Sequence, residues 1–379
     1  MTRAGRRLAL ALSALALLSL PACSKESEGR GSDDNGEQRD ALRVEPVTTL
    51  DVGPAPVASI TVSGNLVAWA AGEPGGNVPN KVVLLEGGMT KEVVRTSYPN
   101  GYVPHVRLGA RWAVYADLSS AEPKGDGEPQ EPWRVEAVAL DTGERVLVTE
   151  QSPSAREDSP APRIEGGSVV WSTRVAGDSG ESEIFAFDLS TRTKRTLARA
   201  VIGNTAVGGG KVYFDRYTEG GSDVFSVALL GSDSTEPEPE PVPEQVSRSG
   251  RASKPAASRF GVAWVEPPQG NSTTIVVVRD GESPEVLARA AGPDDPVGYN
   301  PQVCDGFVIW DPLVGLSARA FGEGAAPALL APRETLSSEA RWSCDGATVA
   351  WVSFKNPVGK VSGTVVNVAR IEAGSAASQ

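Results

Sequence analysis

The stretch that decides the fold runs from Trp342 to Trp351 and reads Trp-Ser-Cys-Asp-Gly-Ala-Thr-Val-Ala-Trp. It predicts two short strands joined by a tight turn at Asp345-Gly346, because glycine readily adopts the backbone angles that such turns need. A similar unit, in which a turn precedes apolar residues and an aromatic, recurs along the chain. It occurs seven times, with the aromatic at Trp69, Tyr115, Trp171, Phe214, Trp264, Trp310 and Trp351.

The spacing of these aromatics indicates the architecture. They lie 41 to 56 residues apart, and most are followed by a polar loop, an apolar run such as Lys81 to Leu85, and a short last strand. A period of about 40–50 residues that carries four strands is typical of the blades of a β-propeller. The sequence therefore predicts an all-β, seven-bladed β-propeller over residues 42–372, with six or eight blades as alternatives. In this fold the seven aromatics are structural core that fills the wedges between blades.

The two ends of the propeller are predicted to meet in one blade. The last unit supplies only three strands before the polar segment 373–379, which is predicted to be a disordered tail. Residues 42–50 have the pattern of a strand and precede the first unit. We expect this segment to complete the last blade, because the pairing removes an open sheet edge.

The motif from Trp342 to Trp351 resembles the W-S-P-D-G repeat of TolB-like propellers, with Cys344 in place of the proline. A weaker copy runs from Val303 to Trp310, and the other five units keep only the apolar residues and the aromatic. The resemblance covers the propeller as architecture and about ten residues as a close motif. It implies a propeller of the TolB-like kind. The separate N-terminal domain of TolB has no counterpart in these residues, so the cell-envelope role of TolB is not expected to carry over.

The N-terminus predicts export and lipidation. Three arginines, Arg3, Arg6 and Arg7, precede an apolar run from Leu8 to Leu20, which has the length of a signal-peptide core and is too short for a membrane span. The run ends in Leu-Pro-Ala-Cys, which resembles the bacterial lipobox with Cys23 as the acylated residue. We therefore expect a lipoprotein signal peptide at 1–22, and a lipidated Cys23 with a disordered tether at 23–41. The predicted location is the extracytoplasmic side of the cell membrane, with acyl chains such as palmitate as the anchor. The alternative is an ordinary secretory signal.

Two cysteines remain after Cys23. Cys304 and Cys344 both precede an Asp-Gly turn at the same point of consecutive repeats, so the repeat places them at equal heights on neighbouring inner strands. An exported protein meets oxidising conditions. We predict a disulfide between them, with two buried free thiols as the alternative.

Charge and residue types narrow the function. The net charge of the full chain is −12, which disfavours nucleic acid as a partner. The single histidine, His105, is interpreted as structural, and no His₂ or His₃ metal site is possible. No metal, cofactor or catalytic residue is predicted. The remaining reactive groups are carboxylates in loops near the rims: Asp126, Glu128, Asp178, Asp215, Asp294, Asp295 and Asp311.

We therefore predict a membrane-anchored binding or scaffolding module for a protein or a cell-envelope glycan, and no enzyme. The alternative is a carboxylate-dependent carbohydrate-active enzyme, either a glycosidase or a polysaccharide lyase, which would use paired loop carboxylates.

Overall fold

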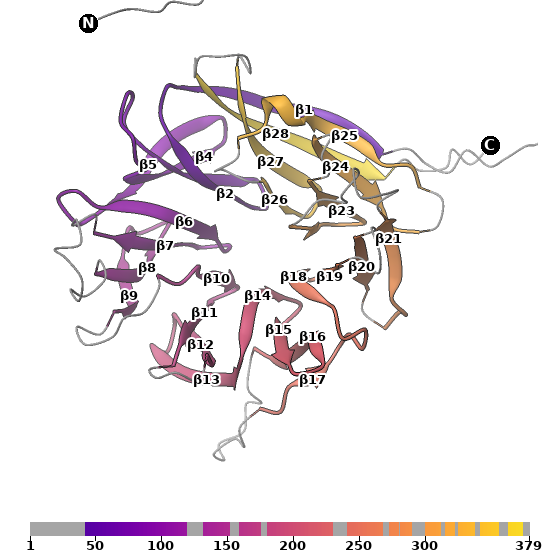
Figure 1. Cartoon of the computed structure of the whole chain (residues 1–379). Coiled ribbons are helices and arrows are strands. Elements are labelled where there is room, and N and C mark those ends of the chain that lie inside the picture. Colours follow the sequence, from indigo (N-terminus) through magenta and orange to yellow (C-terminus); the bar gives the residue numbers. More distant parts are fainter. Residues whose placement is uncertain are drawn as a thin grey trace, which may run out of the picture. The chain divides into compact units, whose positions relative to one another are not determined.

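The computed structural model describes residues 42–119, 132–151, 159–175, 180–229, 241–267, 273–279, 281–289, 300–311, 315–322, 325–337, 342–355 and 363–373. Their regular structure consists of strands β1 to β28 and one 3₁₀ turn, η1 (Arg333–Thr335). The strands form seven four-stranded antiparallel sheets. The sheets stand around a central axis as the blades of a propeller (Figure 1). The prediction of seven blades is confirmed.

Six blades are built from four consecutive strands each. Blade 1 consists of β2 (Val57–Ser63), β3 (Leu66–Ala71), β4 (Lys81–Glu86) and β5 (Met89–Arg95); blade 2 of β6 (Tyr102–Leu108), β7 (Trp112–Leu118), β8 (Trp133–Ala139) and β9 (Arg145–Glu150); blade 3 of β10 (Arg163–Glu165), β11 (Ser168–Arg174), β12 (Ser182–Asp188) and β13 (Thr193–Ala200). Blade 4 consists of β14 (Ile202–Gly208), β15 (Lys211–Thr218), β16 (Gly221–Ala228) and β17 (Glu244–Gln245); blade 5 of β18 (Ser253–Ser258), β19 (Gly261–Glu266), β20 (Thr274–Val278) and β21 (Glu285–Arg289); blade 6 of β22 (Gln302–Val303), β23 (Phe307–Trp310), β24 (Gly315–Ala320) and β25 (Ala328–Pro332).

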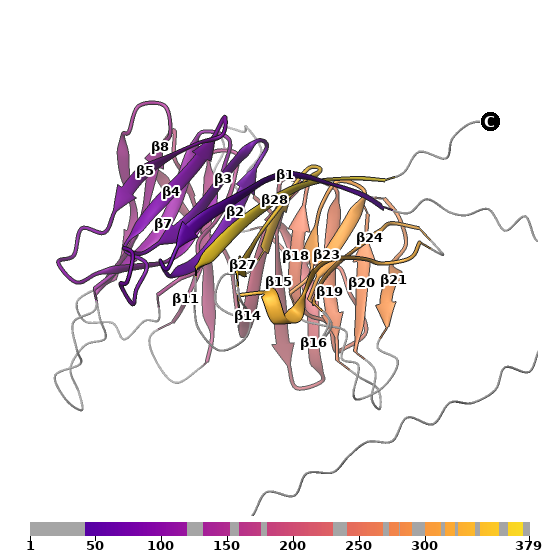
Figure 2. The ribbon, with the colours of Figure 1, turned by 90° about the horizontal axis from the view of Figure 1, so that it is seen from above.

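The seventh blade joins the two ends of the described chain. Its inner strands are β26 (Trp342–Asp345), β27 (Thr348–Phe354) and β28 (Thr364–Ala373), and β1 (Leu42–Gly53) is the outer strand. β1 pairs antiparallel with β28 from Leu42 opposite Ala373 to Gly53 opposite Thr364. Figure 2 shows β1 running along β28. The ring is thus closed as the sequence predicts, and no blade lacks its fourth strand.

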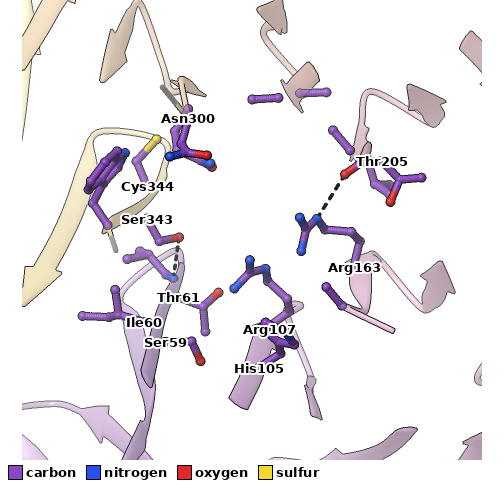
Figure 3. A pocket seen from close by; sticks show the side chains of 18 of the residues that line it. Ser59, Ile60, Thr61, His105, Arg107, Arg163, Thr205, Asn300, Ser343 and Cys344 are labelled. Atoms are coloured by element: carbon purple, nitrogen blue, oxygen red, sulfur yellow. Dashed lines mark hydrogen bonds between the residues drawn. The ribbon is translucent and has the colours of Figure 1, made fainter. Parts of the chain in front are cut away.

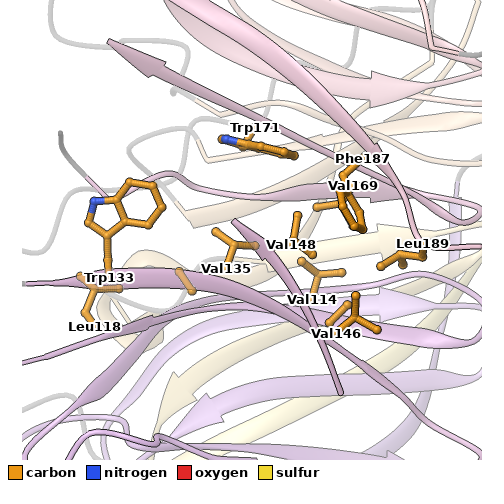
Figure 4. Close-up of a cluster of buried hydrophobic side chains, with 12 residues drawn as sticks. Val114, Leu118, Trp133, Val135, Val146, Val148, Val169, Trp171, Phe187 and Leu189 are labelled. Carbon is orange, nitrogen blue, oxygen red and sulfur yellow. The ribbon is translucent and has the colours of Figure 1, made fainter. Parts of the chain in front are cut away.

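Each repeat aromatic packs against the preceding blade. Trp171, for example, lies in a cluster with Val114, Trp133 and Val135 of blade 2 (Figure 4). Six of the seven aromatics are at most 4% exposed. The seventh, Trp351, is half-buried against blade 6. Burial of an aromatic of this size removes a large apolar area from water, so these contacts hold neighbouring blades together.

Hydroxyl groups on the inner strands add polar links between blades. The Oγ atom of Ser59 accepts a hydrogen bond from the backbone N–H of Val106 at 3.1 Å, and Ser343 Oγ accepts one from Val62 at 3.2 Å. The second bond joins blade 7 to blade 1. It gives the serine of the Trp-Ser-Cys-Asp-Gly motif a structural role at the seam of the ring.

The predicted disulfide is confirmed: Cys304 and Cys344 are bonded, with their Cα atoms 5.9 Å apart. The bond joins Cys304, which directly follows β22 in blade 6, to Cys344 on β26 in blade 7. The predicted signal peptide, Cys23 and the tether lie outside the described residues, as do residues 374–379 of the predicted tail. In the described part of the chain, no helix is long and apolar enough to cross a membrane.

Candidate functional site

The inner strands of all seven blades, β2, β6, β10, β14, β18, β22 and β26, surround a cavity on the propeller axis. Its volume is about 480 Å³, which falls within the range of pockets that bind small organic ligands. Every blade contributes side chains to its wall. We call this cavity the axial channel.

The register of the strands sorts the wall into layers. In each blade, one inner-strand residue lies eight positions before the repeat aromatic. It pairs across the sheet with the residue just before that aromatic, as Arg107 pairs with Val114 and Arg163 with Val170. All seven of these inner-strand residues line the channel. We call them the Arg107 layer: Thr61, Arg107, Arg163, Ala206, Ala256, Gln302 and Ser343.

A second layer lies two residues earlier in each blade, on the inner strand or, for Ala161 and Asn300, just before it. The described residues at these positions also line the channel. We call them the His105 layer: Ser59, His105, Ala161, Asn204, Lys254 and Asn300.

The wall of the channel is cationic. Arg107, Arg163 and Lys254 line it together with His105, and no aspartate or glutamate is among the described residues of the wall. The chain as a whole carries a net charge of −12, so the described residues of this wall differ in sign from the chain as a whole. A cleft lined by charges of one sign concentrates ligands of the opposite sign.

The two arginines have defined orientations. Both guanidinium groups point into the channel (Figure 3). Arg107 Nη1 donates to the backbone oxygen of Val106 at 2.9 Å, and Arg163 Nε donates to that of Thr205 at 3.3 Å. A guanidinium carries five N–H donors and no acceptor, and its fork matches the geometry of carboxylates and phosphates. The pair is therefore suited to hold an oxyanion.

The opposite part of the wall is fixed by an unusual backbone. Lys254 and Asn300 both have positive φ angles, 53° and 70°. Among the described residues only one other non-glycine residue, Arg192, shares this property. The left-handed conformation costs a residue such as lysine about 1–2 kcal/mol, and such strain clusters at functional sites.

Asp215 supports this part of the wall from behind. Its carboxylate is fully buried. Oδ1 accepts hydrogen bonds from the backbone N–H groups of Gly203, at 3.1 Å, and Asn204. Oδ2 accepts from Nδ2 of Asn204 at 3.1 Å and from the backbone N–H of Lys254 at 3.0 Å. One carboxylate thus fixes two residues of the His105 layer on neighbouring blades.

The predicted rim carboxylates do not form a paired site among the described residues. Asp215 is the buried support of the wall, and Asp311 forms an ion pair with Nη1 of Arg333 at 2.9 Å. Five others lie outside the described residues: Asp126, Glu128, Asp178, Asp294 and Asp295. In the part of the chain that the structure describes, no group of three or more histidine, cysteine or acidic residues is placed to hold a metal ion.

His105 was expected to be structural, and the structure places it in the channel wall, two residues from Arg107 on β6. Cys344 of the disulfide also lines the channel. No sequence motif singled out Arg107, Arg163 or Lys254. The signal was their distance from the repeat aromatics: both arginines stand eight residues before an aromatic, and Lys254 stands ten before.

Comparisons with known proteins match the fold alone. No protein-family profile matches the chain, and no curated protein matches it. Among solved structures, the chain is similar to the β-propeller domain of the Trilobed protease from Pyrococcus furiosus, with a TM-score of 0.55 and 10% identity over 84% of this chain and 94% of that one. It is similar to oligogalacturonate lyase from Vibrio parahaemolyticus, with a TM-score of 0.53 and 10% identity over 86% and 97%. It also matches the acylaminoacyl peptidase of Pyrococcus horikoshii, with a TM-score of 0.56 and 10% identity over 83% of this chain and 52% of the peptidase.

These neighbours contradict the prediction that the chain is not an enzyme. The prediction of a binding scaffold rested on two features of the sequence: it has a single histidine, and it has no recognisable catalytic motif. Propellers of this shape, however, belong to a lyase and to peptidases. The chain spans only about half of the peptidase. At 10% identity, the likeness shows that this chain shares their fold, the β-propeller.

Proposed function

We propose that the axial channel binds an acidic oligosaccharide, and that the propeller carries this site on the outer side of the membrane. The observation that supports the proposal is the wall itself: two arginines, a lysine and a histidine line the channel, and no carboxylate is among its described residues. A ligand with carboxylate groups complements these charges and accepts hydrogen bonds from all of them.

The uncharged part of the wall favours a sugar over a simple inorganic anion. Hydroxyl and amide groups stand between the cations in both layers: Ser59, Thr61, Asn204, Asn300, Gln302 and Ser343. Such groups exchange hydrogen bonds with sugar hydroxyls. Oligogalacturonate, the oligosaccharide named in one of the structural neighbours, is an acidic sugar of this kind, so it is the first ligand to test.

The location belongs to the same proposal and rests on the sequence. The basic residues, the apolar run and Leu-Pro-Ala-Cys before residue 24 support export and acylation at Cys23. Two or more acyl chains hold a protein durably at a membrane. A propeller tethered in this way meets cell-envelope glycans.

A second candidate function is a lyase that acts on the same ligand. The neighbouring lyase matches over nearly its whole length, and His105 lies in the channel two residues from Arg107. An imidazole exchanges protons near neutral pH, and a guanidinium neutralises a uronate carboxylate. In β-elimination a base takes the proton at C5, the C4–O4 bond breaks, a C4=C5 double bond forms, and the leaving oxygen takes up a proton. This candidate replaces the paired-carboxylate chemistry expected from the sequence.

The binding proposal is tested by calorimetry on the full chain in detergent, with trigalacturonate and with neutral maltotriose. We expect trigalacturonate to bind and maltotriose to bind far more weakly. Replacing Arg107 or Arg163 by alanine should weaken binding at least about tenfold each, since each removes a charged hydrogen-bond donor. The matched control is Arg111→Ala, because Arg111 is 74% exposed and pairs with Asp141 outside the channel. Equal binding of the two sugars would refute the proposal.

The lyase candidate has a separate readout. Formation of the C4=C5 double bond raises the ultraviolet absorbance of an oligogalacturonate solution. We expect His105→Ala to abolish this increase even at trigalacturonate concentrations that saturate the variant in calorimetry. A wild-type chain that binds trigalacturonate without any increase in absorbance is a binding protein for this ligand and no lyase for it.

A further inference from the structure

Tyr217 stands apart from the other aromatic side chains that the structure describes. It lies near the end of β15 and is 44% exposed, whereas the others are buried or half-buried. Its cross-strand neighbour is Val201, which directly precedes β14, is 40% exposed and accepts the backbone N–H of Tyr217 at 2.9 Å. Residues directly opposite each other in an antiparallel pair share a face. The two side chains therefore form a small apolar patch on the surface of blade 4.

A β-bulge connects this patch to the channel wall. The pairing of β14 with β15 shifts register between Ile202 and Thr205, so that Gly203 and Asn204 together lie opposite Asp215. Gly203 and Asn204 are exposed, and Asn204 lines the channel. A bulge bends its strand and re-aims side chains, and bulges are frequent beside functional sites. The exposed residues of this bulge thus lead from the apolar patch into the channel wall.

Gly203 lets the tyrosine ring approach the wall closely. A Cβ atom at this position would lie 2.8 Å from Cε2 of Tyr217 and 2.8 Å from Oδ1 of Asp215. A side chain there would displace either the ring or the carboxylate that accepts the backbone N–H groups of the bulge. The ring therefore packs against the residue directly before Asn204, and neighbouring Cα atoms of a chain are about 3.8 Å apart. A ligand that extends out of the channel along β14 reaches the ring.

The patch suits the face of a sugar ring better than it suits a charged group. The face of an aromatic ring is electron-rich, and it attracts the weakly positive C–H groups on the apolar face of a pyranose. Asp215 is fully buried, and its carboxylate accepts hydrogen bonds from Gly203, Asn204 and Lys254. Its charge is thus compensated within the protein. The exposed side chains of the patch, Tyr217 and Val201, are uncharged.

From these contacts we propose that Tyr217 forms a second subsite, on which a sugar residue that emerges from the channel stacks its apolar face. The proposal rests on the proposed function and specifies its ligand class: an acidic oligosaccharide that is longer than the part held inside the channel. The arginines of the channel recognise charge, and Tyr217 recognises length.

The test compares a short and a long ligand on the same variants. Calorimetry on the full chain in detergent uses digalacturonate and hexagalacturonate. Tyr217→Ala should weaken hexagalacturonate binding roughly three- to tenfold, the range expected for one stacked ring, and leave digalacturonate binding unchanged. Tyr217→Phe keeps the ring and should bind both ligands as tightly as the wild type. The matched control is Leu147→Ala on β9, whose side chain is 49% exposed on the outer strand of blade 2; it should change neither affinity.

Stacking has its own spectroscopic readout, which a merely structural role of Tyr217 would not produce. Protons that lie over the face of an aromatic ring shift upfield in a proton spectrum. We expect such shifts for the C–H protons of one sugar residue of hexagalacturonate with the wild type and with Tyr217→Phe, and none with Tyr217→Ala. A urea midpoint measured in parallel identifies a variant that has unfolded, and the wild-type spectrum still decides the proposal in that case.

The possible failures are distinguishable. If the wild-type chain binds neither ligand, the proposed function is wrong, and the second subsite falls with it. If the wild type binds both, but Tyr217→Ala weakens neither or weakens both equally, the proposed function stands and the second subsite is wrong. Wild-type spectra without an upfield shift in bound hexagalacturonate also contradict the stacking.

Discussion

The disulfide between Cys304 and Cys344 should contribute a large part of the stability of the ring. It joins blade 6 to blade 7, the blade that β1 completes, and its cysteines are 40 residues apart in sequence. In the chain-entropy model, a loop of this length restricts the unfolded chain by about 4 kcal/mol at 25 °C. Loss of the bond should therefore shift the unfolding equilibrium by roughly a thousandfold. The change acts on the unfolded state, so the folded blades should keep their strand content.

The assay is urea unfolding of the full chain in detergent, followed by tryptophan fluorescence. Oxidised wild type, reduced wild type and the Cys304→Ala/Cys344→Ala variant are compared. Reduced wild type is the cleaner comparison, since Cys304 is fully buried and its replacement by alanine also leaves a small cavity. Intact mass spectrometry verifies the redox state of each sample. If oxidised and reduced wild type unfold at the same urea concentration, the loop-closure reasoning is refuted for this protein.

Three further predictions concern the core, the carboxylate at the end of β10 and the lipid anchor. Trp171→Ala should lower the free energy of unfolding by roughly 3–5 kcal/mol, because the indole is 1% exposed between blades 2 and 3. The control is Met89→Ala, at a side chain that is 76% exposed; it should change the free energy of unfolding by less than about 0.5 kcal/mol. Burial raises the pKa of Glu165, against the opposing hydrogen bond from the backbone N–H of Gly210. Because the folded pKa lies above the unfolded one, ionisation of Glu165 opposes folding: the penalty is absent below the ordinary carboxyl pKa and grows as the pH rises through the folded pKa. Glu165→Gln should therefore raise the urea midpoint at neutral pH and leave it unchanged in acid; a rise of equal size at both pH values would contradict this. Cys23→Ser should abolish labelling with palmitate, and a wild-type chain that takes up no palmitate would disprove the lipid anchor.

The architecture could be predicted from the sequence because its signals are local and repeated. Each blade carries its own turn and aromatic, so seven copies give seven blades without knowledge of distant contacts. The pairing of β1 with the last blade could be predicted because the last repeat supplies only three strands. The disulfide followed from the equal positions of Cys304 and Cys344 in consecutive repeats, which the ring brings to a Cα distance of 5.9 Å.

The chemistry of the channel could not be predicted in the same way, because it depends on side chains that converge from seven separate strands. Arg107 and Arg163 are 56 residues apart in sequence, and nothing local marks them as a pair. Asp215 was assigned to a rim loop by its place after an aromatic. The structure instead places backbone N–H groups against the Asp215 carboxylate. A register shift between Ser253 and Ala256 and the absence of a side chain at Gly203 allow this approach. The prediction that the chain is no enzyme failed because a shortage of histidine excludes only some catalytic sites.

The central claim is that the axial channel is an anion site for an acidic sugar, and a crystal structure grown with tetragalacturonate tests it most directly. The account predicts a uronate carboxylate within hydrogen-bond distance of the Arg107 and Arg163 guanidinium groups. A channel that holds only water, with the sugar absent or bound on the outer strands of the blades, would contradict it.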